Sequence, residues 1–566
     1  MRFVGHCLAA DVRRFWPLIA GWLFVVLGAA AIDGVRPTLA GDPRLVNVIG
    51  IAGTLLWLTE LLLFFVLIAL VVQAHPLVGS DAFWMTRPIP PSTLLLSKLT
   101  LFTVSIVVAP VIVEIVLMTL YHVPAKQAAF VAADMALTQA ALLILLMVGA
   151  ALTRNAPGFA LLCGATLGVL AVALAVDVAI FMTRDDTMTP TVAVLSATDP
   201  LPRDDDPTGM YLWSVLFPAI GLAVLAVQYR ARSRLRAVGL GIAGIVLASV
   251  VVDAWHWPML QPRVISDWAR DASSLRLSAD PATAESRAED LLFTRRSPWN
   301  LIRARVRLAG IQPGWSADVA LLNATIQMND GSIVPTARGG FPAAVPIDSG
   351  EEHPARRATL DLLGVRRVVE SLPAKGDAPV VFVTRNGAAV DPQRAIGTYR
   401  GRFRVALIHR QIEAVLPLRA GVVHQSGAYR FVLDGIDPRR GDGAGLIARE
   451  SRAVSRFERM PIPMYSFYLR NPTEGAALVG YPLDVREVPL LSRFMPFSTG
   501  FAADTSGFVA QGLMIRFSSR TGMEGDSLPI DEAWLAGAEL VIVRTTHEAS
   551  VQRELEMSDF DLRGRR

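Results

Sequence analysis

Five carboxylic acids lie inside long apolar stretches of this chain: Glu60, Glu114, Asp134, Asp177 and Asp253, the last of them close to the end of its stretch. An ionised carboxylate at the centre of a bilayer costs roughly 2.5 to 3.5 kcal/mol on insertion scales, so such groups normally face a cavity or a partner. Residues of this kind relay protons or form subunit contacts inside membranes. For Asp134, which lies near the start of its stretch, the helix dipole is the simpler explanation.

The second half of the chain offers little catalytic chemistry. Its histidines do not follow the spacing of metal ligands; they are His353, His409, His424 and His547. Ser426 lacks the leading glycine of a nucleophile elbow. The sequence contains no phosphate-binding loop of the Gly-x-x-x-x-Gly-Lys-Ser/Thr type, so ATP hydrolysis would belong to another chain. We therefore expect no enzymatic activity, no metal and no cofactor in this chain.

The composition places much of the chain in a membrane. Of the 566 residues, 52% are hydrophobic and 18% are charged, and the mean hydropathy is +0.42, which is too apolar for an ordinary soluble protein. A helix needs about 20 apolar residues to cross a bilayer. Seven stretches of residues 1–258 qualify, and they predict a multi-pass α-helical membrane domain. They are Phe15–Ile32, Val46–Ala74, Leu94–Tyr121, Phe130–Leu152, Gly158–Met182, Met210–Gln228 and Ala237–Trp255.

The basic residues of the short connections predict an orientation. They precede the first stretch or lie in or beside the second, fourth and sixth connections: Arg13, Arg14, Arg87, Lys98, Arg154, Arg230, Arg232, Arg234 and Arg236. Because positive charge is retained inside, the N-terminus is expected inside and the region after the seventh stretch outside. Residues 1–14 space their apolar side chains at a roughly helical period. This indicates either a helix lying on the inner surface or a frayed terminus.

The second connection carries the most distinctive pattern. It combines Phe83, Trp84, Thr86, Arg87, Pro88 and Ile89 with a downstream Lys98. The large aromatic side chains of Phe83 and Trp84 and the guanidinium of Arg87 can dock in a cleft of another protein. Pro88 and the prolines that follow it would make the rest of the connection rigid. An aromatic belt and a positive inner loop would alone explain Trp84 and Arg87.

The whole string resembles the cytoplasmic loop of ABC-2-type export permeases, in particular a divergent bacterial group. In that family the loop lies near a separate cytoplasmic ATP-binding subunit and transmits its motion. The resemblance therefore implies that Phe83, Trp84, Thr86, Arg87, Pro88 and Lys98 couple this chain to an ATPase partner. It also implies a homodimer or a heterodimer with another permease in the inner membrane of a bacterium. The family usually has six membrane helices and no long exported tail, and this chain departs from it in both respects.

Residues beyond about 259 change to the alternating pattern of half-buried antiparallel strands. Candidate strands are Ile302–Leu308, Ala324–Met328, Ser332–Val334, Val380–Thr384, Phe403–Leu407, Tyr429–Leu433, Met464–Leu469, Leu513–Phe517 and Glu539–Thr545. Turn signals at Asn329-Asp330-Gly331 and Asn386-Gly387 separate some of them. We predict a linker or stalk over residues 259–298 and a mostly β, sandwich-like region over residues 299–566. One or two modules are expected, with a helix at Arg357–Leu372 and a boundary near residues 375–395.

Both cysteines, Cys7 and Cys163, lie in the apolar half, so a disulfide cannot hold the β region together. The expected function is that of a permease subunit of an ATP-driven exporter with a periplasmic β-domain, in contact with membrane lipids and without a nucleic-acid partner. The alternative is a membrane-anchored protein that does not transport and whose exported domain binds or scaffolds envelope components.

Overall fold

A computed structural model of the chain describes its helical half and most strands of its β half. The described residues are 2–39, 43–74, 90–153, 155–165, 207–254, 273–279, 285–288, 299–303, 306–312, 314–329, 331, 333–335, 344–345, 354–369, 380–385, 396–437, 443–455, 463–484, 507–518, 528 and 530–561.

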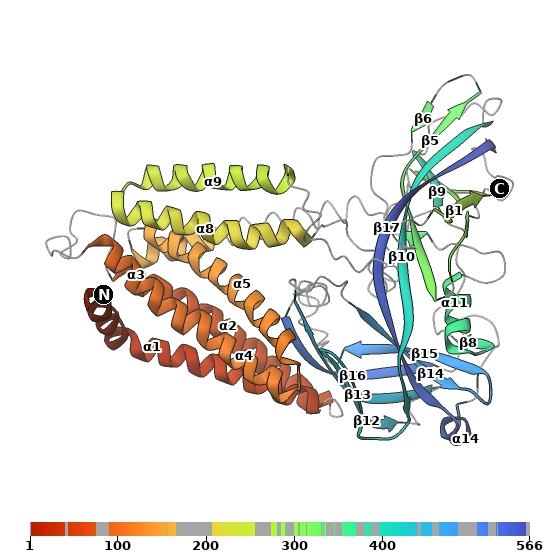
Figure 1. The fold of residues 1–566 in the computed structure, drawn as a ribbon, viewed down its shortest axis with the longest axis horizontal. Coiled ribbons are helices and arrows are strands. Elements are labelled where there is room, and N and C mark those ends of the chain that lie inside the picture. Colours follow the sequence, from red (N-terminus) through yellow and green to blue (C-terminus); the bar gives the residue numbers. More distant parts are fainter. Residues whose placement is uncertain are drawn as a thin grey trace.

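The first half is helical (Figure 1). Its elements are α1 (Arg2–Val35), η1 (Arg36–Leu39), α2 (Pro43–Gln73), α3 (Pro91–Phe102), η3 (Thr103–Val108), α4 (Ala109–Leu120), α5 (Ala125–Leu152), a further helix at Ala156–Ala165, α8 (Pro207–Ala231) and α9 (Arg234–Ala254). Among the described residues, five helices are long and apolar enough to cross a membrane, and α3, η3 and α4 together form one of them. The multi-pass helical domain predicted from the sequence is therefore confirmed.

Residues 2–35 form one helix, rather than a separate segment before the first apolar stretch. Pro17 lies inside α1 and removes one backbone hydrogen bond, which favours a bend. Figure 1 shows the first turns of α1 at an angle to the rest of the helix. The N-terminal residues thus continue the packing of the bundle.

The span from α3 to α4 contains a π-helical segment, η3. Pro110 follows it near the start of α4, and a proline ring clashes with the carbonyl four residues earlier in a regular α-helix. The wider turn of η3 relieves that clash within the apolar span. Insertions of this type are frequently found at functional sites.

The second half is mostly β, as the sequence predicts. Its strands are β1 (Arg276–Ala279), β2 (Glu285–Ala288), β3 (Trp299–Arg303), β4 (Val306–Ala309), β5 (Trp315–Met328), β6 (Ile333–Pro335), β7 (Ala344–Val345), β8 (Arg367–Val369), β9 (Val380–Arg385), β10 (Ile396–Pro417), β11 (Val422–Ser426), β12 (Tyr429–Asp437), β13 (Gly443–Val454), β14 (Met464–Asn471), β15 (Ala476–Asp484), β16 (Gly507–Ser518) and β17 (Glu539–Asp561). Among the described residues, two helices accompany them, α11 (Pro354–Leu363) and α14 (Glu532–Ala536).

A twelve-stranded sheet dominates this half, in the order β11-β12-β13-β16-β15-β14-β17-β10-β5-β6, with β7 beside β5 and β8 beside β15. Tyr429 of β12 and Tyr465 of β14 stack with their ring centroids 3.6 Å apart, although three strands separate β12 from β14 in the sheet. Neighbouring strands lie about 4.8 Å apart, so a flat sheet cannot bring these rings together. The sheet must curl, and an apolar core that includes Phe431, Phe467 and Leu540 fills the curled part.

Among the described strands, β10 and β17 are long enough to contribute to two apolar cores of the same sheet. Their paired register runs from Ile396 opposite Asp561 to Pro417 opposite Glu539. One end contributes Phe403 and Leu555 to a core with β5, and the other end contributes to the curled core. The candidate strand at residues 302–308 is also divided, since β3 pairs with β2 and β9 whereas β4 pairs with β1.

Local turn chemistry explains two further outcomes. The turn at Gly331 is confirmed: Gly331 has φ +83° and its N–H donates to the Met328 carbonyl, which joins β5 to β6. The helix expected over residues 357–372 is shorter, because Gly364 adopts φ +63° after α11. The Val365 and Gly364 N–H groups then donate to the carbonyls of Leu360 and Asp361, which is a Schellman cap. Asn386-Gly387 lies outside the described residues.

Buried tyrosines make the β region sensitive to alkali. Burial raises the pKa values of Tyr399, Tyr429 and Tyr465 above the ordinary value near 10. In the unfolded chain these phenols ionise near pH 10, whereas in the folded chain they stay neutral. Their contribution to stability is therefore complete below about pH 10 and declines as the pH rises above it, by up to about 1.4 kcal/mol per group and pH unit.

The expected result is a steep fall in the unfolding temperature of the β region above pH 10, followed by near-ultraviolet circular dichroism. The variant Tyr429→Phe should keep its stability at neutral pH, because the Tyr429 hydroxyl has no hydrogen-bond partner among the described residues. It should also lose less stability in alkali than the wild type. An identical alkaline profile in the two proteins would show that Tyr429 ionises without cost.

Candidate functional site

The predicted coupling loop lies almost wholly outside the described residues, including Phe83, Trp84, Thr86, Arg87 and Pro88. Its last predicted residue, Lys98, is placed within α3 rather than beside the loop. Pro90 precedes α3 in an extended conformation and Pro91 begins it, which fits the preference of proline for the first turn of a helix. The segment that resembles the permease loop, residues 83–98, therefore ends inside the helical bundle.

Lys98 is fully buried, with no side-chain surface open to solvent or lipid. Its ammonium donates a hydrogen bond to the carbonyl oxygen of Val71 near the end of α2. The nearby charged or ionisable groups that act on it are Asp11, Cys7 and Arg14, all from the first turns of α1. Lys98 thus joins α3 to α2 by a hydrogen bond and to α1 by electrostatic attraction to Asp11.

Asp11 is the residue that the sequence analysis missed. It is 4% exposed and lies on one stripe with Leu8, Phe15, Leu18 and Trp22, which pack in the helical core. Steps of three and four residues along a helix keep side chains on one face, so a carboxylate in such a stripe is directed into the bundle. That spacing was the available signal, and a buried basic partner was its physical requirement.

Other polar side chains are buried close to this pair. Tyr229 of α8 is 1% exposed and is within electrostatic reach of Asp11, and its neighbour Gln228 is fully buried. Among the described residues, neither the Tyr229 hydroxyl nor the Gln228 amide has a hydrogen-bond partner. Gln73 at the end of α2 donates to the Thr153 hydroxyl after α5 at 3.1 Å. We name the set of Asp11, Lys98, Gln228 and Tyr229 the buried polar cluster.

The predicted intramembrane acids fall into separate places. Glu60 of α2 and Glu114 of α4 are partly buried, and both are within electrostatic reach of Asp33 near the end of α1. Asp134 of α5 is 2% exposed, and its backbone carbonyl accepts a hydrogen bond from the Thr138 hydroxyl at 3.0 Å. Asp177 lies outside the described residues. The structure therefore brings Glu60 and Glu114 toward a common third acid, which the sequence analysis did not single out.

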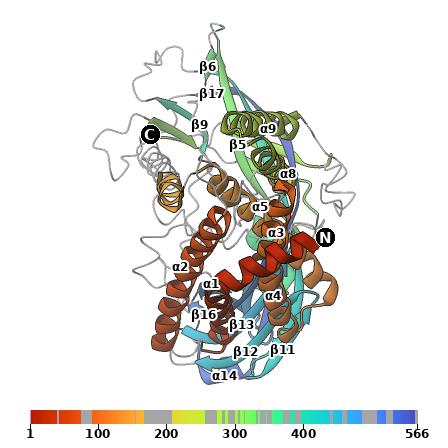
Figure 2. The ribbon, with the colours of Figure 1, turned by 90° about the vertical axis from the view of Figure 1, so that its left-hand side faces the viewer.

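The opposite end of the bundle packs on the sheet (Figures 1 and 2). Met118, Ala128 and Val131 form a small apolar core with Ala453 of β13. Tyr121 contributes at the same junction: its ring lies 5.3 Å from that of Phe508, and its hydroxyl donates to the Gly34 carbonyl at 3.0 Å. These contacts attach the sheet to the ends of α1, α4 and α5.

A backbone contact completes this junction. The Gln425 side-chain amide of β11 donates to the His122 carbonyl at 2.7 Å. His122 has φ +58°, a left-handed conformation that is uncommon for residues other than glycine. The short connection between α4 and α5 is therefore held by the sheet in a conformation that it would not readily keep alone.

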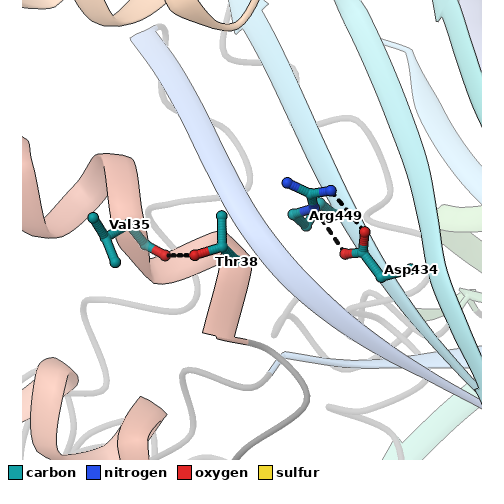
Figure 3. Close-up of polar contacts among 4 residues, drawn as sticks. All are labelled: Val35, Thr38, Asp434 and Arg449. Atoms are coloured by element: carbon teal, nitrogen blue, oxygen red, sulfur yellow. Dashed lines mark hydrogen bonds and ion pairs between the residues drawn. The ribbon is translucent and has the colours of Figure 1, made fainter. Parts of the chain in front are cut away.

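Figure 3 shows the polar groups where η1 passes beside the sheet. The Thr38 hydroxyl donates to the Val35 carbonyl at 2.6 Å and ties η1 to the end of α1. On the sheet, the Arg449 guanidinium donates through Nε and Nη2 to both oxygens of Asp434 at 2.7 Å. This two-bond ion pair fixes β13 to β12 at the junction.

Within the described residues, no group of three or more histidine, cysteine, aspartate or glutamate side chains is arranged to hold a metal ion. Comparison with family models, with curated proteins and with solved structures gives no match. The buried polar cluster, which contains Lys98 of the predicted coupling loop, is the strongest candidate for a functional site.

Proposed function

We propose that this chain is the membrane-spanning permease subunit of an ATP-driven exporter of the ABC-2 type. The proposal rests on the apolar helices, on the resemblance of residues 83–98 to the family's cytoplasmic loop, and on Lys98. Lys98 is the observation that supports the proposal most strongly. It is the last residue of the segment 83–98 that resembles the family's loop, and it is fully buried where α1, α2 and α3 meet. A force applied to the loop would reach three helices through this one side chain.

In the proposed mechanism, a separate cytoplasmic ATPase docks on the loop that contains Phe83, Trp84, Thr86, Arg87 and Pro88. ATP-driven closure of that partner pulls on α3. The bond between Lys98 and the Val71 carbonyl and the attraction to Asp11 carry the movement to α2 and α1. The helices then rock between two arrangements that expose the transport path to alternate sides.

The orientation proposed for the chain follows from its positive inner connections: the N-terminus lies in the cytoplasm of a bacterium and the β region lies outside the inner membrane. The junction supports a coupled β-domain, because the outer ends of α4 and α5 contact β13 and β16 directly. Rocking of the helices would thus move the sheet. Two copies, or one copy and a second permease, would enclose the path.

The test of this proposal is the variant Arg87→Glu in proteoliposomes that contain the chain and its ATPase. Replacing the positive charge of the Arg87 guanidinium by a negative charge should lower the ATPase activity that the permease stimulates by roughly tenfold or more, which is the scale of an allosteric coupling. Arg154→Glu, in a different inner connection, serves as the matched charge-reversal control and should retain stimulation. Normal stimulation of the ATPase by Arg87→Glu, with the protein correctly inserted, would refute the coupling role of the loop.

A further inference from the structure

The connection between α8 and α9 carries a dense group of arginines. Arg230, Arg232, Arg234 and Arg236 are all exposed, and we name them the arginine hairpin. Arg232 has φ +51°, and this left-handed residue reverses the chain between the two helices. In Figure 1 the hairpin is at the end of α8 and α9 that lies away from the sheet. Four guanidinium groups are thus presented at one end of an antiparallel helix pair.

Acidic residues do not neutralise this surface from within α8 and α9. The sequence has no aspartate or glutamate between Asp206 and Asp253. Among the residues that the structure describes, no carboxylate forms an ion pair with Arg230, Arg234 or Arg236. Guanidinium groups remain charged at every physiological pH and bind phosphate oxygens through two parallel hydrogen bonds. Arg230, Arg234 and Arg236 therefore offer strong binding capacity for a phosphate group.

Exposed hydrocarbon side chains border the arginines. Leu235 lies between Arg234 and Arg236 and is 88% exposed. Farther along α9, Val238 and Ile242 are also exposed, and α9 is apolar enough to lie in a bilayer. A ligand that places an anionic group on the hairpin can therefore lay an apolar chain along α9. A lipid fits this surface better than a free anion or an acidic protein, because only the lipid supplies both parts.

We propose that the arginine hairpin binds the phosphate headgroup of an anionic phospholipid, with the acyl chains lying along α9. Clusters of basic residues next to a membrane-spanning helix attract acidic lipids, because their positive charges lie at the level of the lipid headgroups. The inference does not depend on the proposed export function, since it requires only that α8 and α9 lie in a membrane. It predicts selectivity for anionic over zwitterionic lipids, and weaker binding at higher ionic strength.

The experiment is a lipid titration of the purified full-length chain in neutral detergent, with the unfolding temperature as the signal. Phosphatidylglycerol should raise the unfolding temperature, whereas phosphatidylcholine and inorganic phosphate should have little effect. Replacing the four hairpin arginines by glutamine should weaken the apparent affinity for phosphatidylglycerol by roughly 100-fold or more. The matched control replaces four exposed arginines of the β region, Arg276, Arg400, Arg402 and Arg419, and should bind phosphatidylglycerol like the wild type.

Two double variants, Arg230→Gln/Arg232→Gln and Arg234→Gln/Arg236→Gln, keep the test informative where the fourfold variant does not insert. Each should show an intermediate loss of affinity. Equal affinity of the wild type and the hairpin variants for phosphatidylglycerol would overturn the proposal. Equal stabilisation by phosphatidylcholine would overturn it too, and inorganic phosphate acting as strongly as phosphatidylglycerol would show a free-anion site instead of a lipid site.

Discussion

Lys98→Met is expected to destabilise the helical region by about 1 to 3 kcal/mol, because it removes the buried ammonium whose charge attracts Asp11 of α1. It also removes the donor to the Val71 carbonyl. The double variant Asp11→Asn/Lys98→Met should recover most of the loss, since it removes both charges and keeps similar side-chain volumes. The measurement is thermal unfolding of the four proteins of this double-mutant cycle, in detergent, by circular dichroism at a helix wavelength.

Lys126→Met is the matched control for this cycle. Lys126 lies at the start of α5, is exposed, and has its ammonium 5.9 Å from the centre of the Phe130 ring. Its replacement should change the stability by about 0.5 kcal/mol or less. Independent, additive effects of Asp11→Asn and Lys98→Met would contradict the electrostatic link between α1 and α3.

The cycle also separates a structural role of Lys98 from a role in coupling. The double variant should be stable and correctly inserted, yet it lacks the electrostatic attraction between α1 and α3. Under the proposed function it should bind the ATPase normally but transmit its motion poorly. Binding should therefore be retained, with ATPase stimulation reduced by roughly tenfold.

Gly221→Leu is expected to displace α8 from α5 and to cost about 2 to 3 kcal/mol, the upper range for overpacking a core. A Cβ atom added at Gly221 would lie 2.3 Å from Cγ2 of Ile144, which is a buried residue of α5. The β-branched Ile144 has little freedom to move away. Since Tyr229 and Gln228 are carried by the same helix, the change should also disturb the buried polar cluster.

Gly239→Leu on α9 provides the control, because an added Cβ atom there meets no heavy atom within 4 Å. Both substitutions place the same side chain in an apolar helix, so they differ mainly in packing. Gly239→Leu should leave the unfolding temperature unchanged or raise it slightly, because leucine favours helix more than glycine does. Equal behaviour of the two variants would mean that α8 and α5 do not pack as closely as described.

The helices could be predicted from the sequence because lipid imposes a simple rule. A spanning helix must be apolar for about 20 residues, and this signal depends only on local sequence. The stretches predicted at Phe15–Ile32, Val46–Ala74 and Ala237–Trp255 accordingly fall on α1, α2 and α9. Strand positions followed from alternation for a similar reason, as at Tyr429–Leu433 within β12 and Met464–Leu469 within β14.

The arrangement of the sheet could not be predicted, since it depends on contacts between residues far apart in the chain. Nothing local indicates that Tyr429 stacks on Tyr465, or that β10 pairs with both β5 and β17. The candidate site was predicted only in part for the same reason. Lys98 was identified from the loop pattern, but its environment is made by Asp11 of α1 and Val71 of α2.

Purification of the chain from its native host in mild detergent, with mass spectrometry of the proteins that co-elute, tests the central claim most directly. The account predicts a stoichiometric ATP-binding subunit that carries a phosphate-binding loop and that is lost from the complex with Arg87→Glu. Co-elution of envelope proteins or glycans alone, without an ATPase, would contradict the permease function and favour a membrane-anchored envelope protein.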